Sequence, residues 1–119
     1  MDLAARYGGE EFGIILFDTK REQAERIADE ILEAVRQLGI AHQDSSAAPV
    51  LTISVGIACV VPAARRSWAG LIQLADQAVY AAKDGGRNRA VALEQEYEHM
   101  QTGYFHRHTA AKVESKKPQ

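Results

Sequence analysis

A pair of glycines between two strand-forming stretches constrains the fold of this 119-residue chain more than any other feature. In the segment RYGGEEFGIILF, residues 6–17, Gly8 and Gly9 stand directly before an apolar run. Two adjacent glycines readily take the positive φ angles of a tight hairpin turn. We therefore predict a β-hairpin over residues 3–17 with its tip at Gly8 and Gly9.

Two adjacent glutamates, Glu10 and Glu11, follow this tip, and paired carboxylates resist burial unless something compensates their charge. Glycines let phosphate oxygens approach the backbone, because no Cβ keeps them away. A carboxylate beside such a tip can hold Mg²⁺ (or Mn²⁺), which proteins bind through one or two carboxylates and the phosphates of a substrate. Side chains alternate across a strand, so the two glutamates are expected on opposite faces. An ordinary exposed turn with the same residues is the alternative, and the local sequence leaves it open.

Two amphipathic helices are predicted after the hairpin. Residues 20–38 and 68–84 each repeat apolar residues at spacings of three and four, which gives one apolar face. Gly39 follows the first segment and Gly85 the second, and a glycine commonly stands where a helix ends. Each helix therefore has one face to bury against a sheet.

Two further strands complete the predicted fold. Residues 50–61 alternate between large apolar side chains and small ones, as if a helix or another backbone approached the small face closely. Residues 90–93 form a second, short strand. The order hairpin, helix, strand, helix, strand predicts an α+β fold, a mostly antiparallel sheet with flanking helices.

The last part of the chain and its overall charge narrow the classes of function. From Glu94 onward the sequence turns polar, so residues 94–119 are predicted to be a C-terminal extension, a short helix followed by a frayed end. A formal net charge of -2 gives no basic field that would attract nucleic acid. No apolar run reaches the roughly 18 residues of a membrane span, and no signal peptide is visible. These features favour a cytoplasmic protein.

Four separated motifs resemble those of one protein family. RYGGEEF resembles the signature of the GGDEF family, the diguanylate cyclases, in its GGEEF form. Further along, TISVGIA, ADQAVYAAK and GRN are similar to later motifs of that family and stand in the same order. The resemblance implies a partial nucleotide-cyclase-like fold with a ferredoxin-like palm, in which residues 1–93 are an incomplete GGDEF domain.

The resemblance also implies an activity, the condensation of two GTP molecules to cyclic di-GMP with release of pyrophosphate. Each domain of this family binds one GTP and two domains meet face to face, so GTP, cyclic di-GMP and a second copy are the implied partners. Gly8 and Gly9 match the glycines that lie against the phosphates. Glu10 matches the metal-binding carboxylate that helps to activate the ribose 3′-hydroxyl, and Glu11 matches a second, supporting catalytic position.

Two basic residues near the end of the second helix match family residues that contact the GTP phosphates, Lys83 and Arg87. A guanidinium fork or an ammonium group at such a place suits phosphate. Cations also stabilise a helix C-terminus without any ligand, so the residues by themselves allow either role. Asp76, on the same helix, is expected to be structural, paired with backbone or with an arginine near the hairpin such as Arg6.

The family pattern begins earlier than this sequence does. Its D-x-L-T-G-L-x-N-R segment, a strand with another metal-binding aspartate and the guanine-reading residues are not found ahead of the glycines, so we expect a chain that is inactive alone. Asp2 stands at the aspartate of the family's inhibitory R-x-x-D site, as a remnant of it. A sheet without that strand would expose an edge and apolar surface, which predicts self-association. A non-catalytic remnant that binds GTP or a protein partner is the alternative function.

Overall fold

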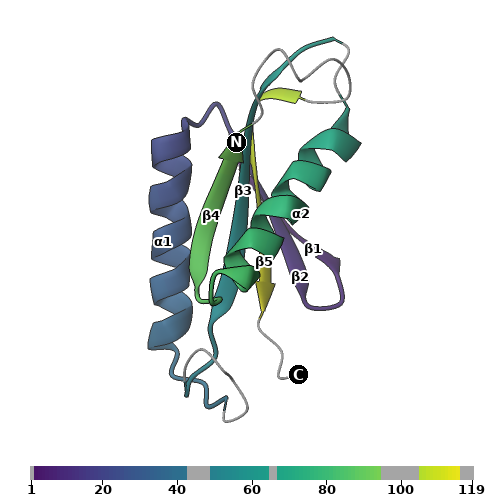
Figure 1. Cartoon of the computed structure of the whole chain (residues 1–119). Helices are drawn as coiled ribbons and strands as arrows, with labels where there is room; N and C mark the ends of the chain where they lie inside the picture. Colours follow the sequence, from purple (N-terminus) through teal and green to yellow (C-terminus); the bar gives the residue numbers. More distant parts are fainter. Residues whose placement is uncertain (1, 43–48, 65–66, 95–104, 116–119) are drawn as a thin grey trace.

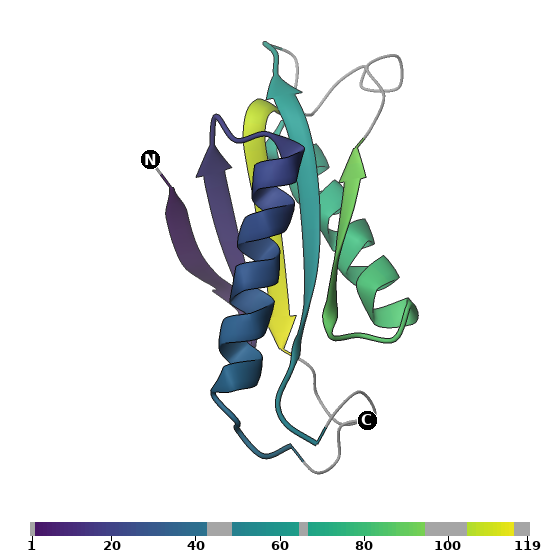
Figure 2. The same cartoon turned by 90° about the vertical axis from the view of Figure 1, so that its left-hand side faces the viewer.

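The computed structural model describes residues 2–42, 49–64, 67–94 and 105–115, the last range by its backbone. These residues form one sheet with a helix on each side (Figures 1 and 2). The elements are β1 (Leu3–Gly8), β2 (Glu11–Phe17), α1 (Arg21–Gln37), β3 (Ile53–Pro62), α2 (Trp68–Asp84), β4 (Arg89–Glu94) and β5 (Phe105–Ser115). Within the described ranges, neither helix combines the length and the apolar character that crossing a lipid bilayer requires.

The five strands of the described residues form a mixed sheet in the order β1-β2-β5-β3-β4. The pairs β1–β2, β2–β5 and β5–β3 are antiparallel, and the pair β3–β4 is parallel. The parallel pair arises because α2 carries the chain back to the end of the sheet where β3 began. The predicted α+β class with a mostly antiparallel sheet and flanking helices is confirmed.

The hydrophobic core lies on both faces of β3, because its alternate residues point to different helices. Ile53, Val55 and Ile57 are buried in a cluster with α1, whereas Ala58 and Val60 are buried in a cluster with α2. Figure 2 shows α1 in front of the sheet and α2 behind it. Both helices therefore pack against the same strand, β3. The pairing register of the sheet then sets the positions of the other strands relative to β3.

Both predicted helices are confirmed to within one residue at each end. α2 begins after Ser67, whose Oγ accepts a hydrogen bond from the Gly70 N–H at 3.5 Å, and it ends at Gly85. α1 is followed by Leu38 and then by Gly39, which has a φ of 63°. The apolar periodicity that predicted the two helices is the pattern that buries them against the sheet.

The predicted hairpin is present, but its tip is displaced by one residue. β1 continues to Gly8, which pairs with Glu11, so the two turn residues are Gly9 and Glu10. The prediction of a tip at Gly8 and Gly9 is wrong because an irregularity in the register between Arg6 and Gly8 lengthens β1 by one residue. Of the two glycines, Gly9 has the positive φ, 51°.

The C-terminal extension differs most from its prediction. The short helix was predicted for residues that include 95–104, which lie outside the described residues. A frayed end is wrong for Phe105–Ser115, because these residues form β5 in the middle of the sheet. A position between β2 and β3 offers backbone hydrogen bonds on both sides of a strand, and a polar segment can use them as well as an apolar one.

Candidate functional site

The hairpin tip and the turn between α2 and β4 lie at the same end of the sheet. The strand register places Glu11 of β2 level with Glu114 of β5, Ser54 of β3 and Arg89 of β4. In Figure 1 the tip and the C-terminal end of α2 both lie at the lower end of the sheet. Two strands separate β2 from β4, which corresponds to about 14 Å across the sheet. The fold therefore gathers two motifs at one end of the sheet, although Gly9 and Arg87 are 78 residues apart in sequence.

The hairpin tip is open to a ligand. Gly8 and Gly9 are both exposed, and no atom lies within 4 Å of a Cβ built on either residue. The guanidinium of Arg6 holds the turn, since its Nε donates to the Gly9 carbonyl at 2.9 Å. An anion can therefore approach the backbone of this turn without meeting a side chain of either glycine.

The two glutamates of the signature occupy different kinds of position. Glu10 is a turn residue and Glu11 is the first residue of β2, and both are half-buried. Among the described residues, no three His, Cys, Asp or Glu side chains cluster as a metal site. The carboxylates of Glu10 and Glu11 fit Mg²⁺, which proteins hold with one or two carboxylates while a substrate's phosphates complete the coordination shell.

Lys83 and Arg87 flank the end of α2, and both are half-buried. Three backbone hydrogen bonds close the helix end: the Gly85 N–H to the Ala81 carbonyl at 2.9 Å, the Gly86 N–H to the Lys83 carbonyl at 3.2 Å and the Arg87 N–H to the Ala82 carbonyl at 2.9 Å. These bonds satisfy carbonyls that a helix end leaves without partners. Lys83 in the last turn of α2 and Arg87 in the turn that follows are therefore both held by defined backbone, and their contact with phosphates stays a prediction.

One residue that contacts the turn after α2, Arg36, is not marked by any motif in the sequence. Arg36 of α1 donates from Nε to Asn88 Oδ1 at 2.8 Å and from Nη2 to the Asn88 carbonyl at 3.4 Å. Asn88 belongs to the GRN motif, but nothing local marks Arg36, which stands 52 residues earlier. A contact over that separation becomes visible only when α1 and the α2–β4 turn are placed in space.

Two other residues with predicted roles are Asp2, next to the hairpin, and Asp76, on α2. Asp2 joins the two hairpin strands at their far end, because its Oδ1 accepts from the Phe17 N–H at 3.1 Å. Its role as part of an inhibitory site stays a prediction. Asp76 is an exposed residue of α2, and its pairing with Arg6 also stays a prediction.

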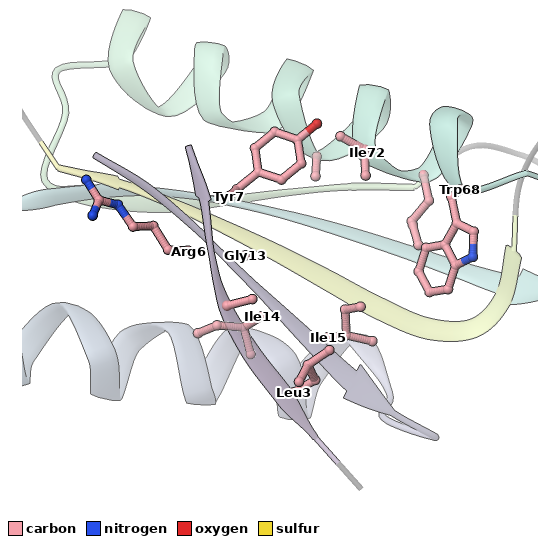
Figure 3. Close-up of a pocket in the computed structure, with 11 residues that line it drawn as sticks. Leu3, Arg6, Tyr7, Gly13, Ile14, Ile15, Trp68 and Ile72 are labelled. Carbon is pink, nitrogen blue, oxygen red and sulfur yellow. The ribbon is translucent and has the colours of Figure 1, made fainter. Parts of the chain in front are cut away.

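A cavity of about 200 Å³ lies between the hairpin and the first half of α2. Figure 3 shows Tyr7 of the hairpin directed toward α2, which contributes Ile72 and Trp68. The lining is mainly apolar and includes Arg6, but it contains neither the signature glutamates nor Lys83 and Arg87. This cavity is therefore distinct from the polar end of the sheet that carries the predicted phosphate contacts.

Comparison with known proteins decides the family. The family described as "Diguanylate cyclase, GGDEF domain" matches residues 1–89 of the chain. The chain belongs to the GGDEF family. The matched range includes the hairpin, α1, β3, α2 and the turn after it, so all the site residues predicted from the sequence lie within the GGDEF match. β5 lies outside it.

Individual GGDEF relatives cover a similar part of the chain. It is 40% identical to the probable diguanylate cyclase DgcT of Escherichia coli (strain K12) over 90 residues, 76% of this chain and 20% of that protein. It is 37% identical to the response regulator PleD of Caulobacter vibrioides over 91 residues, 76% of this chain and 20% of that protein. It is 35% identical to diguanylate cyclase A of Treponema denticola over 88 residues, 74% of this chain and 23% of that protein. The chain thus spans about a fifth of the length of these relatives, and no solved structure matches it significantly.

Proposed function

We propose that this GGDEF chain binds GTP with Mg²⁺ at the end of the sheet formed by the hairpin tip and the α2–β4 turn, and that it acts in cyclic di-GMP signalling. The observation that carries this proposal is that an open glycine turn, two carboxylates and two basic residues lie at the same end of one sheet. Phosphates need cations and unobstructed backbone, and a bound metal needs a carboxylate. The names of the relatives support the same substrate class.

Each residue has a distinct role in the proposed site. The backbone at Gly8 and Gly9 lies against the phosphates, and Glu10 holds Mg²⁺ (or Mn²⁺), which supplies positive charge against the phosphate oxygens when bound. Glu11 supports this carboxylate. Lys83 offers a single charge and Arg87 a planar fork, and both bind oxygens of the same nucleotide.

The reaction that we propose for the family member joins two GTP molecules to cyclic di-GMP and releases pyrophosphate. Each copy presents one GTP, so the condensation requires a second copy facing the first, in the cytoplasm where GTP is available. For the chain by itself we propose nucleotide binding without turnover. A regulatory GGDEF remnant that binds GTP and never catalyses is the alternative, and it shares the binding site.

The test uses the whole chain, titrated with GTP and Mg²⁺ by calorimetry and then incubated and analysed for cyclic di-GMP by mass spectrometry. Glu10→Ala is expected to weaken GTP binding about 10- to 150-fold, because a charge-assisted contact is worth roughly 1.5–3 kcal/mol. Glu30→Ala is the matched control, since Glu30 is an exposed glutamate of α1. Absence of GTP binding by the unmodified chain would refute the proposal. Cyclic di-GMP formed by the chain alone and lost in Glu10→Ala would refute the part about inactivity.

A further inference from the structure

The turn after α2 holds two consecutive non-glycine residues in the left-handed region. Arg87 has a φ of 65° and Asn88 a φ of 48°. Residues other than glycine rarely adopt this conformation, although asparagine does so more often than most. Such a backbone persists when surrounding contacts hold it in place. The contacts around this turn therefore determine how Arg87 is presented.

Arg36 supplies contacts of this kind. Its planar guanidinium bonds both the side chain of Asn88, at 2.8 Å, and the carbonyl of Asn88, at 3.4 Å. The same guanidinium is oriented by its own helix, because Nη1 lies 3.2 Å from Glu33 Oε1, and Gln37 Nε2 donates to Glu33 Oε2 at 3.3 Å. Two bonds from one rigid fork fix the direction of the backbone at Asn88 as well as its position.

Arg89 holds the turn at a second place. Its Nε donates to the Arg87 carbonyl at 3.0 Å. Its guanidinium lies so close to Gly86 that a Cβ there would be 2.7 Å from Nη2. Arg36 and Arg89 are thus both engaged by the turn itself, whereas within the described residues the Arg87 side chain makes no hydrogen bond.

We infer that Arg36 is a positioning residue, which holds the Gly85–Asn88 turn from α1 so that Arg87 faces the phosphate site. The consequence for nucleotide binding rests on the proposed function. α1 and α2 lie on opposite faces of the sheet (Figure 2). Arg36 therefore connects the Gly85–Asn88 turn to α1, a helix that contributes no other residue to the proposed site. Positioning of the turn depends on the planar guanidinium of Arg36, which makes both bonds to Asn88 at once, and not on its charge alone. Lysine has no such planar group and cannot replace it.

The test compares four variants of the whole chain, Arg36→Gln, Arg36→Lys, Asn88→Asp and the control Arg26→Gln, an exposed arginine of α1. Amide hydrogen exchange of residues 85–88 is measured without nucleotide, and GTP affinity is measured by calorimetry with Mg²⁺. Arg36→Gln and Arg36→Lys are expected to speed exchange in the turn and to weaken GTP binding about tenfold, the effect of losing a charge-assisted contact. Asn88→Asp keeps the acceptor oxygen and is expected to keep exchange in the turn slow, whereas Arg26→Gln is expected to retain both properties.

The two measurements separate this inference from the proposed function. Unchanged exchange in Arg36→Gln overturns the inference, and so does faster exchange with unchanged GTP affinity. Full retention of both properties by Arg36→Lys overturns the dependence on the fork. If the unmodified chain binds no GTP, the proposed function fails, and exchange in the nucleotide-free variants still decides whether Arg36 holds the turn. Circular dichroism of each variant establishes that it is folded.

Discussion

At the scale of single residues, Gly56 sets the distance between a strand and a helix. It lies on the face of β3 that packs against α2, between the buried residues Ser54 and Ala58. A Cβ at this position would overlap the carbonyl oxygen of Ala75 and the backbone nitrogen of Val79. Backbone atoms cannot rotate away as a side chain can, so a larger residue here must push α2 off the sheet.

Gly56→Ala is therefore expected to lower the free energy of unfolding by about 3 kcal/mol or more, the upper range for overpacking a core. Gly13→Ala in β2 is the matched control, because nothing lies within 4 Å of a Cβ at Gly13. It should change stability by no more than about 1 kcal/mol, in the direction of greater stability. Urea unfolding measures both. Equal losses in the two variants would contradict the close approach of α2 to β3.

At the scale of elements, the hairpin shows how its two glycines differ. Gly9 has a φ of 51°, which side chains disfavour, whereas Gly8 is a strand residue paired with Glu11. A two-residue turn with glycine in its first position matches the twist of antiparallel strands. Gly9 is therefore needed for the shape of the turn, whereas a Cβ at Gly8 would meet open space and would matter only to a ligand bound against the backbone.

Replacing each glycine by alanine separates the effect on the conformation of the turn from the effect on the space around its backbone. Gly9→Ala is expected to cost about 1–2 kcal/mol of stability, the penalty for a left-handed non-glycine residue. Gly8→Ala should leave the free energy of unfolding within about 1 kcal/mol of the unmodified chain. Both should weaken GTP binding, because either Cβ stands between the backbone and a phosphate. Thermal unfolding and GTP calorimetry give the two readouts, and a Gly8→Ala chain that binds GTP normally would show that the phosphates do not contact this residue.

At the scale of the whole molecule, β5 connects the two parts of the sheet. The hairpin strand β2 pairs with β5, and β5 pairs with β3, so within the described residues β5 is the strand that joins the hairpin to the core. With β5 in place, the outer strands of the sheet are β1 and β4. Both edges of β2 and both edges of β3 are thus paired within the described residues, and strand pairing between copies is left to β1 and β4. Self-association stays a prediction.

Ala111→Pro tests whether β5 has this role. Ala111 pairs with Ile14 of β2 and with Ile57 of β3, and a proline there removes a ladder hydrogen bond from a central strand. We expect faster amide exchange throughout β2 and a loss of at least about 2 kcal/mol of stability, because the hydrogen bond is lost and its carbonyl partner is left unsatisfied inside the sheet. Ala111→Val keeps the backbone N–H and suits a strand, so it is expected to leave amide exchange in β2 unchanged. Normal exchange in β2 of the proline variant would contradict the central position of β5.

Local sequence pattern by itself determined both helices, the hairpin and the family of this chain. The spacing of apolar residues predicted α1 and α2 to within one residue, because the same spacing forms the face that each helix buries. The motif residues predicted the candidate site, and the roles of those residues stay predictions. In the fold, Glu11 of the hairpin lies level across the sheet with Arg89, which follows the GRN motif. Patterns of this kind are local, so they can be recognised without knowing the partner element.

Only the tertiary structure decided the features that depend on a partner far away in sequence. β5 is polar, and its place in the sheet follows from backbone hydrogen bonds that β2 and β3 offer to almost any sequence. The one-residue displacement of the hairpin tip follows from the pairing register of β1 with β2. The bond between Arg36 and Asn88 spans 52 residues. Backbone pairing and long-range side-chain contacts leave no periodicity in the sequence, and for that physical reason they appear only once the chain has folded.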